Sequence, residues 1–171
     1  MTDLYELIRN VPDFPRPGIQ FKDITPLLRH PAGLALAVEL LANPFRGRNI
    51  DIVVGAESRG FIFGTALAQA LSAGFVPIRK PKKLPADKVS ITYDLEYGTD
   101  TLEIHRDAIR AGEKCLLVDD LLATGGTMEA CCGLVEKLGG QILGIAVLIE
   151  LQFLNARNKF NRYEMHSVLK Y

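Results

Sequence analysis

The clearest structural signal in the chain runs Leu116-Leu117-Val118-Asp119-Asp120-Leu121-Leu122-Ala123-Thr124-Gly125-Gly126-Thr127. An apolar run, typical of a buried strand, meets two adjacent carboxylates and then a turn of small residues that opens a helix near Thr127. Gly tolerates unusual backbone dihedrals and has no Cβ to block a ligand, so the amides of this turn can converge on one point. The unpaired N–H groups and the positive dipole end of the helix favour a phosphate at that point.

The two acids before the turn suggest a second feature of the ligand, because their charge would repel a phosphate. Carboxylates suit hydroxyl groups such as those of a ribose, so the stretch predicts a site for a phosphorylated sugar. The residues assigned to this site are Asp119, Asp120, Ala123, Thr124, Gly125, Gly126 and Thr127. The alternative is an ordinary strand-to-helix turn in which an Asp caps the helix. The sequence contains neither the triphosphate loop G-x-x-x-x-G-K-[ST] nor the dinucleotide loop G-x-G-x-x-G.

The stretch from Val118 to Thr127 resembles the phosphoribosyl pyrophosphate loop of type I phosphoribosyltransferases, and in particular their adenine phosphoribosyltransferase branch. The resemblance runs from Pro12 through Glu150. It implies an α/β fold with a mostly parallel central sheet flanked by helices and a flexible hairpin or hood loop. It also implies an activity in purine salvage, namely transfer of the 5-phosphoribosyl group to N9 of adenine, giving AMP and pyrophosphate.

Size and composition favour one globular domain over residues 1–171. The 171 residues are 48% hydrophobic, which is enough for one substantial core. The formal net charge is zero and the pI is about 6.8, which argues against nucleic acid or an anionic membrane as a general partner. No apolar run is long enough to span a bilayer, and the first residues lack a signal sequence. Cys115, Cys131 and Cys132 lie in apolar surroundings, so we expect reduced buried thiols and a cytoplasmic protein.

The pattern of apolar residues predicts alternating strands and helices. We expect helices over 4–11, 32–41, 61–71 and 128–138, a helical turn at Thr25-Pro26, and strands over 50–54, 75–78, 116–118 and 142–149. Pro12, Pro15, Pro17 and Gly18, which follow the first predicted helix, predict an extended loop. Continuous apolar strands separated by helices indicate a mostly parallel sheet covered on both faces, with the ligand at the loops that follow the strands.

The segment 90–105 alternates apolar and polar residues and predicts an antiparallel hairpin that turns at Gly98-Thr99-Asp100. Ile91, Tyr93, Leu95 and Tyr97 fall on one face. Periodicity alone fits a half-solvated hairpin without a function equally well. The family resemblance implies more: Glu96 would be the catalytic carboxylate that accepts the N9 proton, and Tyr97 would close over the substrates, in a flexible catalytic loop of about 80–105.

A second strand and small-residue turn spans Val53 to Phe61 and carries Glu57, Ser58 and Arg59. A guanidinium in such a turn can bind two oxygens of a pyrophosphate, and the resembled family binds pyrophosphate here. We therefore predict a pyrophosphate site at these three residues and also list Arg59 among the catalytic residues. The alternative is a surface Arg59 paired with Glu57.

Basic side chains concentrate after the predicted strand 75–78, at Arg79, Lys80, Lys82, Lys83 and Lys88. Prolines stiffen this segment, so closure onto an anionic substrate is a reasonable expectation, although a solvated basic loop is the usual explanation of such runs. We assign Arg79, Lys80 and Lys83 to pyrophosphate. The resemblance implies a homodimer in which Arg79 reaches the partner's substrate.

Two anion sites beside a ribose site predict a substrate that is phosphorylated at both ends, as phosphoribosyl pyrophosphate is. We expect Mg²⁺ as the cofactor, held mainly by substrate and water without a dedicated protein metal site. The three histidines are scattered and form no ligand pattern.

The N-terminal segment of about 1–30 is the expected base-binding segment, since Pro12 to Ile24 resembles the corresponding loop of the adenine branch. The residues assigned to adenine are Gln20, Phe21, Lys22 and Leu121. Backbone groups of the extended segment would bond the purine edge, Phe21 would stack on the ring, and Leu121 would cover its other face. Core packing is the alternative for Phe21. Lys22 stands where the family often has Arg, and Gln20 where it often has an apolar residue.

Two functional alternatives remain open at this point. One keeps the chemistry with another base, such as hypoxanthine, guanine or xanthine. The other is a nucleotide-sensing regulator without catalysis, although the chain has no helix-turn-helix extension or basic helix.

Overall fold

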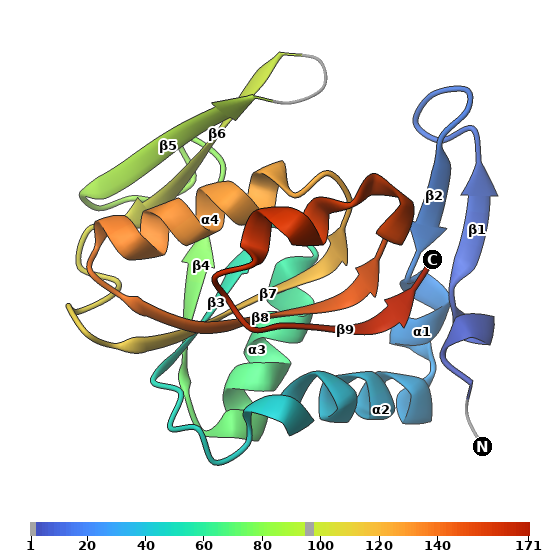
Figure 1. Ribbon diagram of the computed structural model, residues 1–171, viewed down its shortest axis with the longest axis horizontal. Helices are drawn as coiled ribbons and strands as arrows, with labels where there is room; N and C mark the ends of the chain where they lie inside the picture. The colour runs from blue at the N-terminus through green and yellow to red at the C-terminus, as the bar shows by residue number, and fades with distance from the viewer. Residues whose placement is uncertain (1–2, 95–97) are drawn as a thin grey trace.

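A five-stranded parallel sheet forms the centre of the computed structural model, which describes residues 3–94 and 98–171 (Figure 1). The strand order is β4-β3-β7-β8-β9, and every neighbouring pair is parallel. The bounds of these strands are Ile52–Ala56 for β3, Gly74–Ile78 for β4, Lys114–Leu122 for β7, Gln141–Glu150 for β8 and Met165–Lys170 for β9.

Helices cover both faces of this sheet. Figure 1 shows α4 on one face, and α2 with α3 on the other. The helices are α1 (Thr25–Arg29), α2 (Pro31–Ala42), α3 (Gly60–Leu71) and α4 (Gly126–Lys137), and short 3₁₀ turns are η1 (Tyr5–Leu7), η2 (Asn43–Phe45), η3 (Gln152–Leu154) and η4 (Ala156–Phe160). The crossover helices α3 and α4 connect β3 to β4 and β7 to β8, as expected for parallel strands.

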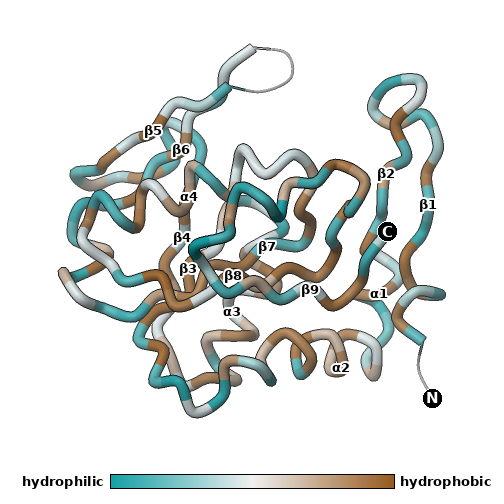
Figure 2. The backbone as a smooth tube through the Cα atoms, in the orientation of Figure 1, coloured by the Kyte–Doolittle hydropathy of each residue, from teal (hydrophilic) through white to brown (hydrophobic). Residues whose placement is uncertain are grey.

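The core consists of two clusters, one on each face of the sheet. Successive residues of β7 alternate between them, because side chains of a strand point to opposite faces. Cys115 and Leu117 belong to the cluster under α4, whereas Leu116 and Val118 belong to the cluster under α2 and α3. Both faces are therefore apolar, which explains the unbroken apolar runs that predicted these strands. Figure 2 shows the same hydrophobic band along the central strands.

Two antiparallel hairpins complete the fold. One pairs β1 (Arg9–Pro12) with β2 (Gln20–Asp23), and the other pairs β5 (Lys88–Asp94) with β6 (Thr99–His105). Ile91 and Tyr93 of the second hairpin pack against the cluster under α4, so the apolar face predicted from their alternation is confirmed for these two residues. The predicted α/β class, with a mostly parallel central sheet flanked by helices, is confirmed as well.

Two element predictions need correction, both near the chain ends. The helix predicted over 4–11 is wrong: only η1 is helical, and β1 follows it because Arg9–Pro12 pairs with β2. The apolar spacing is satisfied by burial of Leu4 and Ile8 without a helix. The strand β9 was not predicted, since its polar Ser167 breaks the apolar run; that hydroxyl is buried against Glu150 and Arg157.

The three cysteines are free and buried, as predicted. In the part of the chain that the structure describes, no helix has the length and apolar character needed to cross a membrane.

Candidate active site

The loop after β7 presents an open helix terminus to a cavity of about 260 Å³, which is lined by residues 57–59 and 119–128. Helix α4 begins at Gly126, and its N-cap is Gly125 with φ +87°, a left-handed conformation that favours Gly. Among the described residues no side chain caps α4, so the alternative in which an Asp caps this helix is wrong. The first N–H groups of α4 are therefore available to a ligand.

Residues of η4 pack against this loop at Gly125. A Cβ at Gly125 would lie 3.1 Å from Phe160 Cε2 and 3.3 Å from the Ala156 side chain. Close packing thus fixes the loop in addition to its backbone conformation. Sequence reasoning missed this support because Ala156 and Phe160 lie in a polar segment with no strand or helix periodicity.

The two acids at the end of β7 occupy surroundings that oppose their charge. The side chain of Asp120 is 5% exposed, and its Oδ2 lies 2.9 Å from Arg59 Nε. No hydrogen bond from the described residues reaches this oxygen, so the contact with Arg59 is an ion pair only. Burial raises the pKa of Asp120, and Arg59 acts in the opposite direction. Burial, and then the neighbouring charge of Asp120, raise the pKa of Asp119 well above its usual value.

The loop after β3 faces these acids across the cavity. Arg59 pairs with Asp120, whereas Glu57 accepts hydrogen bonds from Arg79 Nε (3.2 Å) and the Lys80 amide (2.6 Å). The alternative that paired Arg59 with Glu57 is therefore wrong. The Glu57–Ser58 peptide bond is cis.

The close approach of the two loops depends on a glycine at the start of α3. A Cβ at Gly60 would lie 3.0 Å from Asp119 Oδ1 and 3.2 Å from the Val118 carbonyl oxygen. Any larger residue would push α3 away from β7 and would widen the gap between the two loops.

The basic segment after β4 divides into bound and exposed side chains. The Arg79 guanidinium lies 5.7 Å from the Phe61 ring centroid and bonds Glu57, and Lys80 forms an ion pair with Asp100. Lys83 is exposed. Arg79 and Lys80 are thus held by ion pairs next to the loop of Glu57. The alternative of a solvated basic loop applies to exposed side chains such as Lys83.

The N-terminal hairpin brings Phe21 next to the loop after β3. Its ring centroid lies 5.1 Å from the Arg59 guanidinium carbon and 5.1 Å from the ring of Phe14. Phe21 is half-buried and belongs to neither core cluster, so the core-packing alternative is wrong. Leu121 lines the cavity from β7.

The residues on either side of Phe21, Gln20 and Lys22, differ in whether their polar groups already have a partner in the protein. The Lys22 ammonium bonds Asn10 Oδ1 at 2.6 Å and lies 3.5 Å above the Tyr171 ring centroid. Gln20 is exposed and lies opposite Pro12 in the register. Pro12 has no N–H and cannot donate to the Gln20 carbonyl. The main-chain carbonyl of Gln20 therefore accepts no hydrogen bond from Pro12, its partner in the hairpin.

Glu96 and Tyr97 lie outside the described residues. The end of β5 that precedes them in the sequence lies against the start of α4: a Cβ at Gly126 would be 3.4 Å from the Tyr93 ring and 3.6 Å from the Asp94 carbonyl oxygen. The Tyr93 hydroxyl also lies 3.2 Å from Thr127 Oγ1. This contact was not predicted, and the prediction that the hairpin turns at Gly98-Thr99-Asp100 is wrong for its last two residues, because Thr99 and Asp100 belong to β6 and Asp100 pairs with Tyr93.

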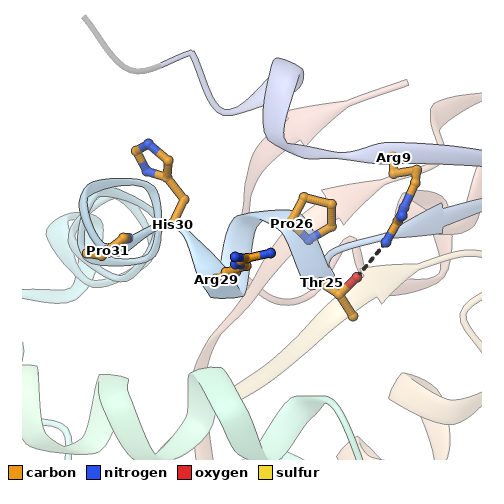
Figure 3. A pocket seen from close by; sticks show the side chains of 6 residues that line it. All are labelled: Arg9, Thr25, Pro26, Arg29, His30 and Pro31. Atoms are coloured by element: carbon orange, nitrogen blue, oxygen red, sulfur yellow. Dashed lines mark hydrogen bonds between the residues drawn. The ribbon is translucent and has the colours of Figure 1, made fainter.

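A second hollow, of about 570 Å³, lies between β1 and the start of α2 and is lined by Arg9, Thr25, Pro26, Arg29, His30 and Pro31 (Figure 3). Two of its polar side chains serve local structure. Arg9 bonds Asp23 and Thr25, and His30 Nδ1 accepts the Gly33 N–H at the start of α2. We therefore place the candidate site at the smaller cavity, where an open helix terminus and a pair of acids meet.

The arrangement can hold one ligand that carries both anionic and hydroxyl groups. Within residues 3–94 and 98–171, no three His, Cys, Asp or Glu side chains form a group that could bind a metal ion. The fold and this site define a phosphoribosyltransferase. The family model for the phosphoribosyl transferase domain matches residues 23–169.

Relatives narrow the family further. The chain is 59% identical to the adenine phosphoribosyltransferase of Acidobacterium capsulatum, over 98% of this chain and 93% of the relative. Among solved structures it is similar to adenine phosphoribosyltransferase from Rhodothermus marinus, with a TM-score of 0.94, 54% identity, and coverage of 98% of this chain and 96% of that one. The chain belongs to the adenine phosphoribosyltransferase family.

A ligand-bound neighbour is the adenine phosphoribosyltransferase of Saccharomyces cerevisiae, complexed with an imino-altritol bisphosphate and adenine. It has a TM-score of 0.90 and 43% identity, over 97% of this chain and 96% of that one.

Proposed function

We propose that this protein transfers the 5-phosphoribosyl group of phosphoribosyl pyrophosphate to N9 of adenine, giving AMP and pyrophosphate in purine salvage. The observation that carries the proposal is the uncapped start of α4 beside the buried Asp120 and the half-buried Asp119, in a chain that is 59% identical to an adenine phosphoribosyltransferase. The yeast relative was crystallised with adenine, which supports adenine as the base.

The loop after β7 is the proposed ribose 5-phosphate site. The amides of residues 123–127 and the Thr124 and Thr127 hydroxyls would bond the 5′-phosphate, aided by the dipole of α4. Asp119 and Asp120 would accept hydrogen bonds from the ribose hydroxyls. Burial raises the pKa of both carboxyl groups, and hydrogen bonds from ribose hydroxyls would favour their ionised forms.

The pyrophosphate site would be formed by Glu57, Ser58, Arg59, Arg79, Lys80 and Lys83. In the structure, Arg59 lines the cavity and pairs with Asp120, whereas Arg79 pairs with Glu57. We propose Mg²⁺ as the cofactor, held mainly by diphosphate and water; the carboxylate oxygens at the site are the kind of ligand that Mg²⁺ accepts. When bound, it would neutralise charge on the leaving group.

Adenine would lie between Phe21 and Leu121. Phe21 beside Arg59 offers an aromatic face, and stacking on a base contributes about 1–3 kcal/mol in nucleic-acid-binding proteins. The main-chain carbonyl of Gln20, to which Pro12 cannot donate, can accept a hydrogen bond from the amino group at the purine edge. An exocyclic amine is a donor, whereas the carbonyl of hypoxanthine or guanine at the same position is not, so this group favours adenine.

The proposed reaction breaks the bond from ribose C1 to the diphosphate oxygen and forms a bond from C1 to N9. Its transition state has oxocarbenium character, as in glycoside hydrolysis. The N9 proton would pass to the Glu96 carboxylate, and Tyr97 would close over the substrates. These two roles rest on the sequence resemblance, and their residues follow the strand that lies over Gly126.

We further propose that residues 1–171 act as one phosphoribosyltransferase domain, with 1–30 as the base-binding segment and about 80–105 as the catalytic loop. A homodimer would allow Arg79 to reach the partner's substrate. Free buried cysteines support a cytoplasmic location, and the zero net charge gives no support for nucleic acid or membrane as a partner.

A base panel tests the proposal. The protein would be incubated with phosphoribosyl pyrophosphate, Mg²⁺ and labelled adenine, hypoxanthine, guanine or xanthine, and nucleotide formation would be measured. We expect AMP from adenine and little product from the other bases. Turnover of guanine but not adenine would contradict the assigned base, and binding of the sugar diphosphate without any turnover would favour a non-catalytic sensor.

A further inference from the structure

A chain of four polar side chains connects the basic segment after β4 with the start of α4. The Lys80 ammonium forms an ion pair with Asp100 Oδ2. The same oxygen lies 3.4 Å from the Tyr93 hydroxyl, which in turn lies 3.2 Å from Thr127 Oγ1. The two middle members face each other across the β5-β6 hairpin, in the register Tyr93↔Asp100.

Both ends of this chain are groups that the proposed function assigns to substrate anions. Lys80 belongs to the proposed pyrophosphate site and Thr127 to the proposed 5′-phosphate site. In the structure, these groups are held by one carboxylate and one hydroxyl near the turn of the hairpin. The hairpin therefore occupies donors that phosphate oxygens would otherwise use.

The Asp100 carboxylate is well held in this position. Its Oδ1 accepts the Thr101 amide at 2.8 Å, and its side chain is 21% exposed. Partial burial acts to raise the pKa of Asp100, but the hydrogen bond from Lys80 and further donors outweigh it and lower the pKa below the usual value. The group is thus an anion at neutral pH, with Lys80, Tyr93 and the Thr101 amide as its described polar neighbours.

A carboxylate and a phosphate oxygen cannot both take the same ammonium without repelling each other. We propose that Asp100 is an internal substitute for a diphosphate oxygen: it holds Lys80 in the empty protein and gives it up when pyrophosphate binds. Asp100 thereby weakens pyrophosphate binding and eases release of this product. After release of Lys80, the Tyr93 hydroxyl remains as a donor to Asp100. The inference rests on the proposed function, because it needs Lys80 to contact the diphosphate.

The test is Asp100→Asn, with Asp100→Ala as a second variant should the first fold poorly. Pyrophosphate would be titrated into the protein by calorimetry, with Mg²⁺ present. We expect the Kd for pyrophosphate to fall about two- to fivefold, the effect of removing one partly exposed ion pair, and the difference to shrink at high salt. An unchanged or higher Kd in a folded variant would overturn the inference. A merely structural role of Asp100 predicts weaker binding, never tighter.

Two controls locate the effect. In a Lys80→Met background, Asp100→Asn should leave the Kd unchanged; equal tightening there would exclude Lys80 as the route. Thr92→Val alters the same hairpin by removing the Thr92–Thr101 hydroxyl contact of 2.9 Å, and it should not tighten binding. A wild-type protein that neither binds pyrophosphate nor forms AMP would contradict the proposed function as well. Wild-type binding without tightening in the variant would contradict this inference alone.

Discussion

Asp119 combines a central place in the proposed site with an unfavourable environment for its charge. Burial and the charge of Asp120 raise its pKa in the folded protein. A carboxyl with a raised folded-state pKa lowers stability at pH 7, and this loss disappears as the pH falls below the pKa of the unfolded chain. The residue is therefore retained at a cost in stability, as is common at functional sites.

We predict that Asp119→Asn increases the melting temperature at pH 7 and lowers kcat/KM for phosphoribosyl pyrophosphate by about 10²-fold or more. The first effect follows from removal of a buried charge, and the second from loss of bonds to the ribose hydroxyls. Thermal unfolding from pH 7 down to pH 4 should show the stability gap closing. The exposed Asp107→Asn is the matched control and should change neither quantity. A less stable or fully active Asp119→Asn protein would refute the assignment.

Glu96→Gln tests the proposed general base. The substitution keeps the shape of the side chain but removes its capacity to take the N9 proton. We predict a fall in kcat of about 10²–10⁴-fold with little change in the Kd for phosphoribosyl pyrophosphate. Single-turnover AMP formation and a separate binding titration would measure both. An unaffected kcat would exclude Glu96 from proton transfer.

Among the structural elements, the junction of β7 and α4 contributes most to the site. Gly125 has both a positive φ and a closely packed Cα, whereas Gly112 has φ +85° and no atom within 4 Å of a Cβ position. Comparing substitutions at these two glycines therefore distinguishes the effect of backbone strain from the effect of side-chain crowding. We predict that Gly125→Ala and Gly112→Ala each lose about 1–2 kcal/mol of backbone stability, and that only Gly125→Ala also raises the KM for phosphoribosyl pyrophosphate.

Unfolding curves and steady-state kinetics of the two Gly-to-Ala variants check this prediction. Equal KM values in both would mean that Phe160 and Ala156 yield without disturbing the phosphate loop. The expected loss of affinity in Gly125→Ala alone would connect η4 with substrate binding.

The sequence was most informative where local chemistry and the fold agree. The loop after β7 combines a buried strand, an acid pair and glycines within twelve residues, so the site and its strand could be predicted together. The β5-β6 hairpin was predictable from its alternation and from Gly98. The N-terminal hairpin was not, because the spacing of Leu4, Leu7 and Ile8 also fits a helix, and the pairing of β1 with β2 decides between them.

Contacts distant in sequence were beyond prediction for a physical reason. The pairing of Arg59 with Asp120, the contact of Phe21 with Arg59 and the support of Gly125 by Phe160 depend on how the layers pack. No periodicity within a segment carries that information. The sequence therefore predicted which loops form the candidate site, and both line the same cavity, but it did not predict which partners hold those loops in the structure.

A partly buried ion pair between Arg157 and Glu150 stabilises the C-terminal part of the molecule. Arg157 bonds both carboxylate oxygens of Glu150, the Met165 carbonyl and the Ser167 hydroxyl, and so joins η4 to β8 and β9. The hydrogen bond from Arg157 is the main reason why the pKa of Glu150 lies below its usual value. A lowered folded-state pKa adds stability above the unfolded value near 4.5, and this stability is lost as the pH falls below it.

We predict that Arg157→Met lowers the free energy of unfolding at pH 7 by about 2–3 kcal/mol, since it leaves Glu150 buried without its partner. The loss is smaller than for a fully buried pair because about a third of the Arg157 side chain is exposed. Denaturant unfolding at pH 7 and pH 3.5 measures the effect, and the difference from wild type should narrow at the lower pH. The exposed Arg106→Met, whose partner Asp87 is also exposed, should have little effect. A loss that does not depend on pH would argue against the ion pair.

Titration of ¹⁵N-labelled protein with ribose 5-phosphate tests the phosphate loop most directly, with backbone amide shifts as the readout. We expect saturable shifts at the amides of Thr124, Gly125, Gly126 and Thr127, and no comparable change around the second hollow at Arg9 and Arg29. Shifts confined to that hollow, or none at the loop at saturating sugar phosphate, would contradict the placement of the substrate.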